Sequence, residues 1–258
     1  MRLKNYIPGI LLLIAAVAIT GFLCRTFLQD KAHKETLNGN CKIDPDFVTA
    51  VLIDDTDPIS IERDEAAAFI LKLAEDAPRY SRFVLYRLSE SSFENGGKPV
   101  PAQETCNPFG KTDRADFLKE DKTELKRERD KFLREIKKIT EALLNVKEKP
   151  YSPIMEGIHS VAVAEFFSLK SEAKRHLVIV SDMMQNTKDF SMFSKKQQKD
   201  FERFKRRPYY RRIKTKALEN AQVSVFELVR NSEAQNDDIV LFWKDYFNDQ
   251  KAEADFVR

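Results

Sequence analysis

Two apolar runs, Phe47–Ile53 and His176–Val180, constrain this chain most, because each has the composition of a β-strand that is buried on both faces. Val223–Val229 is a further expected strand. Strands of this kind belong to sheets that are covered on both sides, and such sheets are mostly parallel. Segments with helical periodicity lie between the runs. The sequence therefore predicts an α/β fold with a mostly parallel central sheet and helices on both faces.

One strand of this sheet should be antiparallel. Residues Arg82–Leu88 form a further expected strand, and Asn95-Gly96-Gly97 is a strong hairpin signal. The chain should therefore turn back into a short edge strand near Val100–Cys106. Helices are expected at 61–77, 113–147, 152–169, 193–219 and 237–247.

Two of these helices have further features. Segment 113–147 is either an amphipathic helix that packs on the sheet or a coiled-coil arm for a partner. The helix at 152–169 should begin with Ser152 as its N-cap and Pro153 at position N1.

The N-terminus predicts a membrane anchor. Residues Asn5–Cys24 carry no charge, and a helix of this length crosses about 30 Å of hydrocarbon. We expect one transmembrane helix that serves as an uncleaved signal anchor. The alternative is a cleaved signal peptide, because Ala16-Val17-Ala18 has a small-x-small form. Residues 1–25 would form the anchor, 26–45 a polar tether and 46–258 the α/β domain.

The composition is that of a folded domain. The 44 Lys and Arg nearly balance the 41 Asp and Glu, and an apolar share of 42% is enough for a core. Only 7 residues are Gly, which excludes a collagen-like chain and disfavours an all-β fold. Three Cys are too few for a disulfide scaffold and lack the paired spacing of a zinc site.

Acidic side chains follow two of the expected strands. Asp54, Asp55 and Asp57 come after the first run, and Asp182 follows His176–Val180. Ligands of open α/β sheets bind at the carboxyl ends of the strands. Carboxylates with hydroxyls are hard oxygen ligands, which suit Mg²⁺ or Mn²⁺. The nearby hydroxyls are those of Thr56, Ser60, Ser152 and Ser181.

At these residues the chain resembles the von Willebrand factor A (vWA) domain, a family with a metal-ion-dependent adhesion site. The family's Asp-x-Ser-x-Ser loop would correspond to Asp54-Asp55-Thr56-Asp57-Pro58, in which Thr replaces the first Ser and Pro the second. The family's distant Thr falls near Ser152, and its later Asp falls on Asp182. The resemblance implies a Mg²⁺ or Mn²⁺ site formed by Asp54, Thr56, Ser152 and Asp182.

Two further side chains, Asp57 and Ser60, are either additional metal ligands or caps of the following helix. The resemblance implies a non-enzymatic binding or assembly module that grips a protein partner, with a divalent cation as the link. The alternative is a metal-dependent hydrolase or phosphotransferase that uses the same acidic cluster. No Ser-His-Asp or Cys-His set is evident, and we expect no catalytic residues.

A basic stretch follows at 195–216, with eleven Lys and Arg against two acids. One interpretation is a solvated helix whose aromatic residues pack inward. The other is a patch that meets anionic lipid or an acidic protein face, nucleic acid being disfavoured behind a membrane anchor. The patch residues are Arg203, Arg206, Arg207, Arg211 and Arg212.

Cys41 and Cys106 are the only cysteines outside the expected anchor. In the strand order of the vWA family, the second strand separates the first and third, which puts both cysteines at the same edge of the domain. We hypothesise a disulfide between them, which requires the oxidising, periplasmic side of a bacterial inner membrane. The alternative is two free thiols on a cytoplasmic domain, because Arg2 and Lys4 before the apolar stretch are opposed by basic residues after it.

Overall fold

The computed structural model of this chain describes residues 37–38, 41–54, 63–88, 99–108, 122–145, 151–193, 200–228, 235 and 237–257. The expected anchor and most of the tether lie outside these residues. No helix within the described ranges is long and apolar enough to span a bilayer. Two short strands, β1 (Leu37–Asn38) and β2 (Cys41–Lys42), pair antiparallel ahead of the main sheet.

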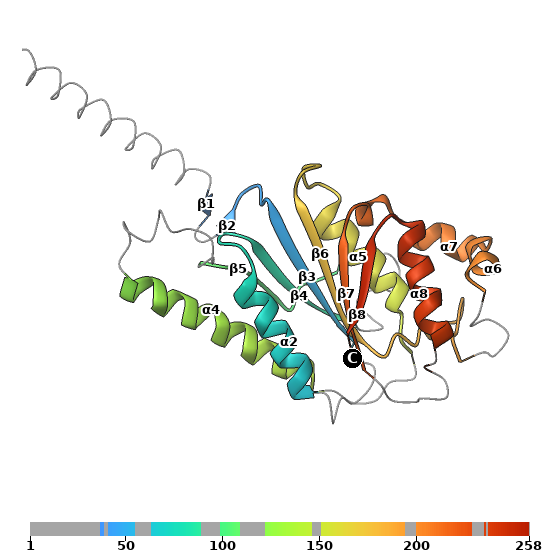
Figure 1. Cartoon of the computed structure of the whole chain (residues 1–258), viewed down its shortest axis with the longest axis horizontal. Helices are drawn as coiled ribbons and strands as arrows, with labels where there is room; N and C mark the ends of the chain where they lie inside the picture. Colours follow the sequence, from blue (N-terminus) through green and yellow to red (C-terminus); the bar gives the residue numbers. More distant parts are fainter. Residues whose placement is uncertain are drawn as a thin grey trace, which may run out of the picture.

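The core is a six-stranded sheet with the order β5-β4-β3-β6-β7-β8 (Figure 1). Neighbouring strands are parallel except β4 and β5, which confirms the predicted α/β class and its antiparallel edge. The strands are β3 (Phe47–Asp54), β4 (Arg82–Leu88), β5 (Gln103–Cys106), β6 (Lys174–Ser181), β7 (Gln222–Glu227) and β8 (Glu253–Val257).

Helices cover both faces of the sheet (Figure 1). On one face lie α2 and α4, and on the other lie α5, α6, α7 and α8. The strand β3 shows why both covers are needed, because Val51 and Ile53 pack toward α2 and α4 while Ala50 and Leu52 pack toward α5 and α8. The helices are α2 (Arg63–Asp76), α4 (Lys122–Leu143), α5 (Ile154–Phe166), α6 (Phe201–Lys205), α7 (Pro208–Ile213), the 3-10 turn η4 (Lys216–Leu218) and α8 (Asp237–Asp249).

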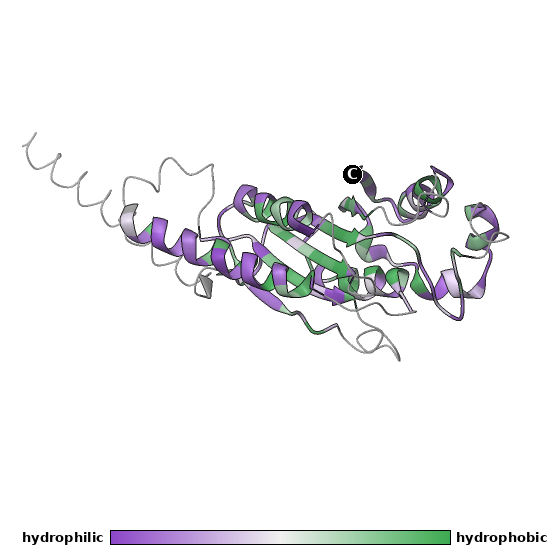
Figure 2. Ribbon diagram, turned by 90° about the horizontal axis from the view of Figure 1, so that it is seen from below, coloured by the Kyte–Doolittle hydropathy of each residue, from purple (hydrophilic) through white to green (hydrophobic). Residues whose placement is uncertain are grey.

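The hydropathy of the chain follows this layering. Figure 2 shows apolar strands at the centre and hydrophilic outer surfaces on the helices. The helix α4 packs against α2 through its apolar side, where Phe132 and Ile136 are buried. The described part of α4 therefore packs in the layer that covers the sheet. Residues 113–121 and 146–147 of the predicted helix lie outside the described residues.

The basic stretch is not one helix, as the sequence predicted, but two short helices and a 3-10 turn. Pro208 is the reason for the break, because a residue that precedes proline is pushed out of the helical region. Arg207 accordingly has an extended backbone with ψ 145°, and α7 begins at Pro208. The edge strand β8 was also missed, since its alternating, half-exposed residues follow α8 after a turn of three residues.

Candidate functional site

A pair of acidic strand ends lies at the centre of the sheet. β3 ends at Asp54, and β6, its parallel neighbour, ends at Ser181, immediately before Asp182. From β3 the chain continues to β4 on one side, and from β6 it continues to β7 on the other. This reversal of strand order is the position at which open α/β sheets bind ligands. We call Asp54, Ser152, Ser181 and Asp182 the switch-point site.

Two hydroxyls hold the Asp54 carboxylate. The Ser181 hydroxyl donates to Asp54 Oδ2 at 2.8 Å, and the Ser152 hydroxyl donates to the same oxygen at 3.0 Å. The donors lie 127 and 98 residues away in sequence, so only the folded chain brings them together. Asp54 is only 3% exposed. Such hydrogen bonds to an ionised acceptor are stronger than those between neutral groups.

Ser152 is not the N-cap of α5, and this corrects the sequence analysis. The N-cap residue is Pro153, without a side-chain capping bond. The backbone of Ser152 instead pairs with Asn186, with N–H···O distances of 3.0 and 2.9 Å in the two directions. The Ser152 hydroxyl therefore does not cap α5 and instead donates a hydrogen bond to Asp54.

Asp182 supplies the second carboxylate of the switch-point site. Burial raises its pKa to about 7, and the charges of Asp54 and Glu227 act in the same direction, whereas a hydrogen bond from the Met184 amide opposes the shift. Asp182 is 7% exposed and forms no salt bridge with a described residue. Bringing a cation close to this pair of acids would relieve their repulsion.

The loop after Asp182 is fixed by contacts that sequence reasoning missed. Met183 adopts a left-handed backbone with φ 59°. The Trp243 indole donates to the Met183 carbonyl at 2.8 Å, and the Gln235 amide donates to the Asp182 carbonyl at 3.0 Å. Trp243 is the single Trp of the chain, and it is the sequence feature that could have indicated a buried side chain that fixes this loop. These bonds fix the backbone beside Asp182, close to Asp54.

The structure thus brings together three of the four predicted metal ligands, Asp54, Ser152 and Asp182. Thr56, Asp57 and Ser60 lie outside the described residues. Ser181, which the sequence analysis named only as a nearby hydroxyl, contacts Asp54 directly. Within the described ranges, no group of three or more His, Cys, Asp and Glu side chains could hold a metal ion. The two carboxylates and two hydroxyls are nevertheless the hard oxygen donors that Mg²⁺ and Mn²⁺ prefer.

The basic stretch has an apolar inner side and a charged outer side. Phe201, Phe204, Tyr209 and Tyr210 are buried, as the solvated-helix interpretation requires. The rings of Phe204 and Phe242 lie 5.2 Å apart, which ties α6 to α8.

The arginines of this stretch divide into two groups. The guanidinium carbon of Arg207 lies 5.6 Å from the ring centroid of Phe190, and that of Arg212 lies 5.6 Å from the ring centroid of Tyr209. Arg212 also pairs with Asp189 at 2.6 Å. Arg203, Arg206 and Arg211 are exposed and form no salt bridge with a described residue. These three arginines are therefore the part of the patch that is available to an anionic partner.

Asp249, at the end of α8, holds the basic stretch in place. Lys205 and Lys214 pair with its two carboxylate oxygens at 2.5 Å each, and the Tyr210 hydroxyl donates to it at 2.6 Å. Partial burial raises the pKa of Asp249, but these three partners outweigh burial and lower it to about 2. The Asp249 carboxylate thus joins α6 and α7 to α8.

The lowered pKa predicts an acid-dependent loss of stability. Because the pKa of Asp249 is lower in the folded than in the unfolded protein, its ionised carboxylate stabilises the fold above about pH 4. This contribution is lost as the pH falls toward 2. At about 1.4 kcal/mol per pKa unit, a shift from 3.8 to about 2 is worth at most about 2.5 kcal/mol, and solvent screening of the partly exposed Lys205 and Lys214 reduces this value. Asp249→Asn should therefore lower Tm at pH 7 and flatten its fall between pH 4 and 2. Thermal unfolding across this range checks it, with exposed Asp245→Asn as the control that should match wild type.

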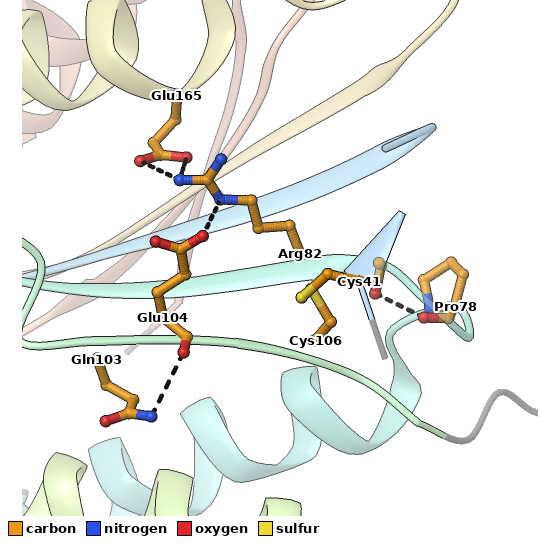
Figure 3. Close-up of a disulfide and its surroundings, with 8 residues drawn as sticks. Cys41, Pro78, Arg82, Gln103, Glu104, Cys106 and Glu165 are labelled. Atoms are coloured by element: carbon orange, nitrogen blue, oxygen red, sulfur yellow. Dashed lines mark hydrogen bonds and ion pairs between the residues drawn. A yellow bond between two sulfur atoms is a disulfide. The ribbon is translucent and has the colours of Figure 1, made fainter. Parts of the chain in front are cut away.

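The disulfide that the sequence analysis proposed is present in the structure. Cys41 and Cys106 are bonded, with Cα atoms 5.1 Å apart and a sequence separation of 65. Figure 3 shows the bond where β2 meets the end of β5, beside Arg82. β4 lies between β3 and β5, which is the strand order that the vWA resemblance implies. The disulfide fixes the end of the tether to the edge of the sheet.

No protein-family model matches this sequence, and no curated protein matches it. One solved structure that matches is the crystal structure of an aerotolerance-related membrane protein from Bacteroides fragilis NCTC 9343 with multiple mutations to serines. The two chains are 10% identical with a TM-score of 0.42, and the match covers 82% of this chain and 90% of that chain. This likeness is too low to carry a function from that protein to this chain.

Proposed function

We propose that this protein is a membrane-anchored, vWA-like binding module that holds a divalent cation at the switch-point site and uses it to bind a protein partner. The observation that carries the proposal is the convergence of two buried carboxylates and two hydroxyls from separate segments at the point where the strand order reverses. The vWA-type strand order supports the same conclusion.

Each residue of the site has a distinct role in this proposal. Asp54, Thr56, Ser152 and Asp182 would hold the cation, and the Ser181 hydroxyl orients the Asp54 carboxylate. When bound, the cation supplies a positive charge that a carboxylate of the partner can approach. The bonds from Trp243 and Gln235 keep the backbone beside Asp182 in one conformation, so the site is preorganised.

Cation binding by the full chain in detergent micelles tests this proposal. We expect calorimetry with Mg²⁺ or Mn²⁺ to give heat with the wild type and none with Asp54→Ala or Asp182→Asn. At ten times the Kd, the cation should also stabilise the wild type by about 1.4 kcal/mol. The exposed carboxylate of Asp245 provides a matched control, and Asp245→Asn should bind as the wild type does.

Stability without metal separates loss of binding from loss of fold. Asp182→Asn removes a buried charge that Asp54 and Glu227 repel, so the metal-free variant should be at least as stable as the wild type. Absence of heat with the wild type at millimolar Mg²⁺ and Mn²⁺ would contradict the proposal. Cation-dependent turnover of a phosphate ester would favour a hydrolase or phosphotransferase instead.

The exposed arginines of the basic stretch suit a partner with an acidic surface. Charge of this kind accelerates association and loses its effect in high salt. Arg203, Arg206 and Arg211 would provide this attraction, in addition to the cation at the switch-point site.

A further inference from the structure

Two large apolar side chains are exposed at the edge of the sheet where the parallel strands begin. Phe167, directly after α5, is 71% exposed, and Ile43, directly after β2, is 70% exposed. Figure 1 shows β2 beside the start of β3 at this end of the sheet. Exposed aromatic and aliphatic side chains near basic residues are typical of surfaces that lie on a membrane interface.

A pocket of about 300 Å³ opens beside Phe167. Its polar and charged lining comprises Ser171, Arg175, Lys216, Asn220 and Glu219. Glu219 is already paired with Lys251 at 2.5 Å. Arg175 and Lys216 form no salt bridge with a described carboxylate, which leaves the pocket with a net positive charge.

The loop that forms this pocket is held in place by Arg175. Its guanidinium donates to the carbonyls of Lys170 and Ala173 at 2.9 and 3.0 Å. This bonding fixes the chain between Phe167 and β6, so the aromatic ring and the pocket have a defined relative position.

The same loop contacts the segment that arrives from the tether. Lys170 pairs with Asp44 at 2.5 Å, and the Lys174 amide donates to the Asp46 carbonyl at 2.9 Å. The disulfide fixes Cys41 close by in sequence. Only about 16 residues separate Cys24, at the end of the apolar stretch, from Cys41, and they span at most about 55 Å. The pocket therefore lies within reach of the membrane that would hold the anchor.

We propose that this edge of the sheet is a lipid-facing surface, in which the pocket takes the phosphate of an anionic phospholipid headgroup and Phe167 enters the interface. The inference rests on the proposed membrane anchor, which would keep the edge at a high local concentration of lipid. A basic pocket next to an exposed aromatic ring matches the boundary between headgroups and acyl chains. Docking at this edge would leave the switch-point site, at the opposite ends of the strands, turned away from the bilayer.

Tryptophan fluorescence of the full-length chain in lipid nanodiscs tests this arrangement. Phe167→Trp places a reporter at the surface, and the wild type supplies the background of Trp243, which is fully buried. With phosphatidylglycerol mixed into phosphatidylcholine, we expect a blue shift of the emission from the introduced indole and its quenching by brominated acyl chains. Both effects should shrink in phosphatidylcholine alone and in high salt.

Charge reversal supplies the matched controls. Lys216→Glu in the Phe167→Trp background should abolish the dependence on phosphatidylglycerol. Lys72→Glu, at an exposed position of α2 on the other face of the sheet, should leave it unchanged. If the emission does not depend on lipid composition while the chain still copurifies with the discs, the lipid-facing surface is wrong. The membrane anchor is not contradicted by that result.

Two other outcomes would also overturn the inference. Failure of the wild type to copurify with the discs contradicts the anchor itself. A change in emission that inorganic phosphate reproduces in detergent would identify a site for free phosphate instead of a lipid headgroup.

Discussion

Reduction of the Cys41–Cys106 disulfide should lower the free energy of unfolding by about 4 kcal/mol. The bond closes a loop of 65 residues in sequence separation that contains β3, α2, β4 and β5. Opening a loop of this length restores conformational entropy to the unfolded chain, and the chain-entropy relation gives this value. Urea unfolding of the full chain with and without reductant measures it, and the fluorescence of Trp243 reports on the core.

Serine variants separate this effect from side reactions of the reductant. Cys41→Ser with Cys106→Ser should be as unstable in oxidising buffer as the reduced wild type. Cys24→Ser should retain both the stability of the wild type and its sensitivity to reductant. Equal stability of the oxidised and reduced wild type would show that the bond does not constrain the unfolded chain.

The same bond bears on the location of the domain. A structural disulfide persists in the periplasm and is rare in the cytoplasm, so we propose the periplasmic side. In whole cells, Cys41 and Cys106 should then resist an alkylating reagent until they are reduced. Alkylation of both without reduction would place the domain on the cytoplasmic side.

The positions of the central strands could be predicted because their composition depends little on distant contacts. Val48–Asp54 and His176–Ser181 are buried on both faces, and continuous apolar runs identify such strands directly. The edge strand β8 gave no such signal, because Glu253 and Asp255 alternate with half-buried residues. Edge strands of this kind are defined by their neighbour, which the local sequence does not reveal.

The sequence predicted which residue types would form the candidate site, but it did not predict the contacts between them. The acids Asp54 and Asp182 stand out because each follows a buried run. The role of Ser152 could not be read locally, since Ser before Pro is a frequent cap signal and its real partners are Asn186 and Asp54. The bond from Trp243 to Met183 joins residues 60 apart, and only the packing of α8 on the sheet creates it.

A buried carboxylate between β4 and α5 provides the second large expected effect. The Glu165 side chain is only 2% exposed and pairs with Arg82 at 3.2 Å. It also accepts a hydrogen bond from the Tyr86 hydroxyl, and burial together with this contact raises the pKa of Tyr86. Arg82 reaches outward to Glu104 at 3.2 Å, so one guanidinium joins a buried and an exposed acid (Figure 3).

Glu165→Ala should therefore cost about 3 kcal/mol of unfolding free energy, because it leaves the buried Tyr86 hydroxyl without its acceptor and Arg82 without its inner partner. Glu165→Gln keeps an acceptor for Tyr86 and should cost less than half as much. Glu104→Ala, at the exposed end of the same Arg82, should cost under about 1 kcal/mol. Urea unfolding of the three variants checks the order, and an equal loss for Glu165→Ala and Glu104→Ala would show that the buried pair does not fasten α5 to the sheet.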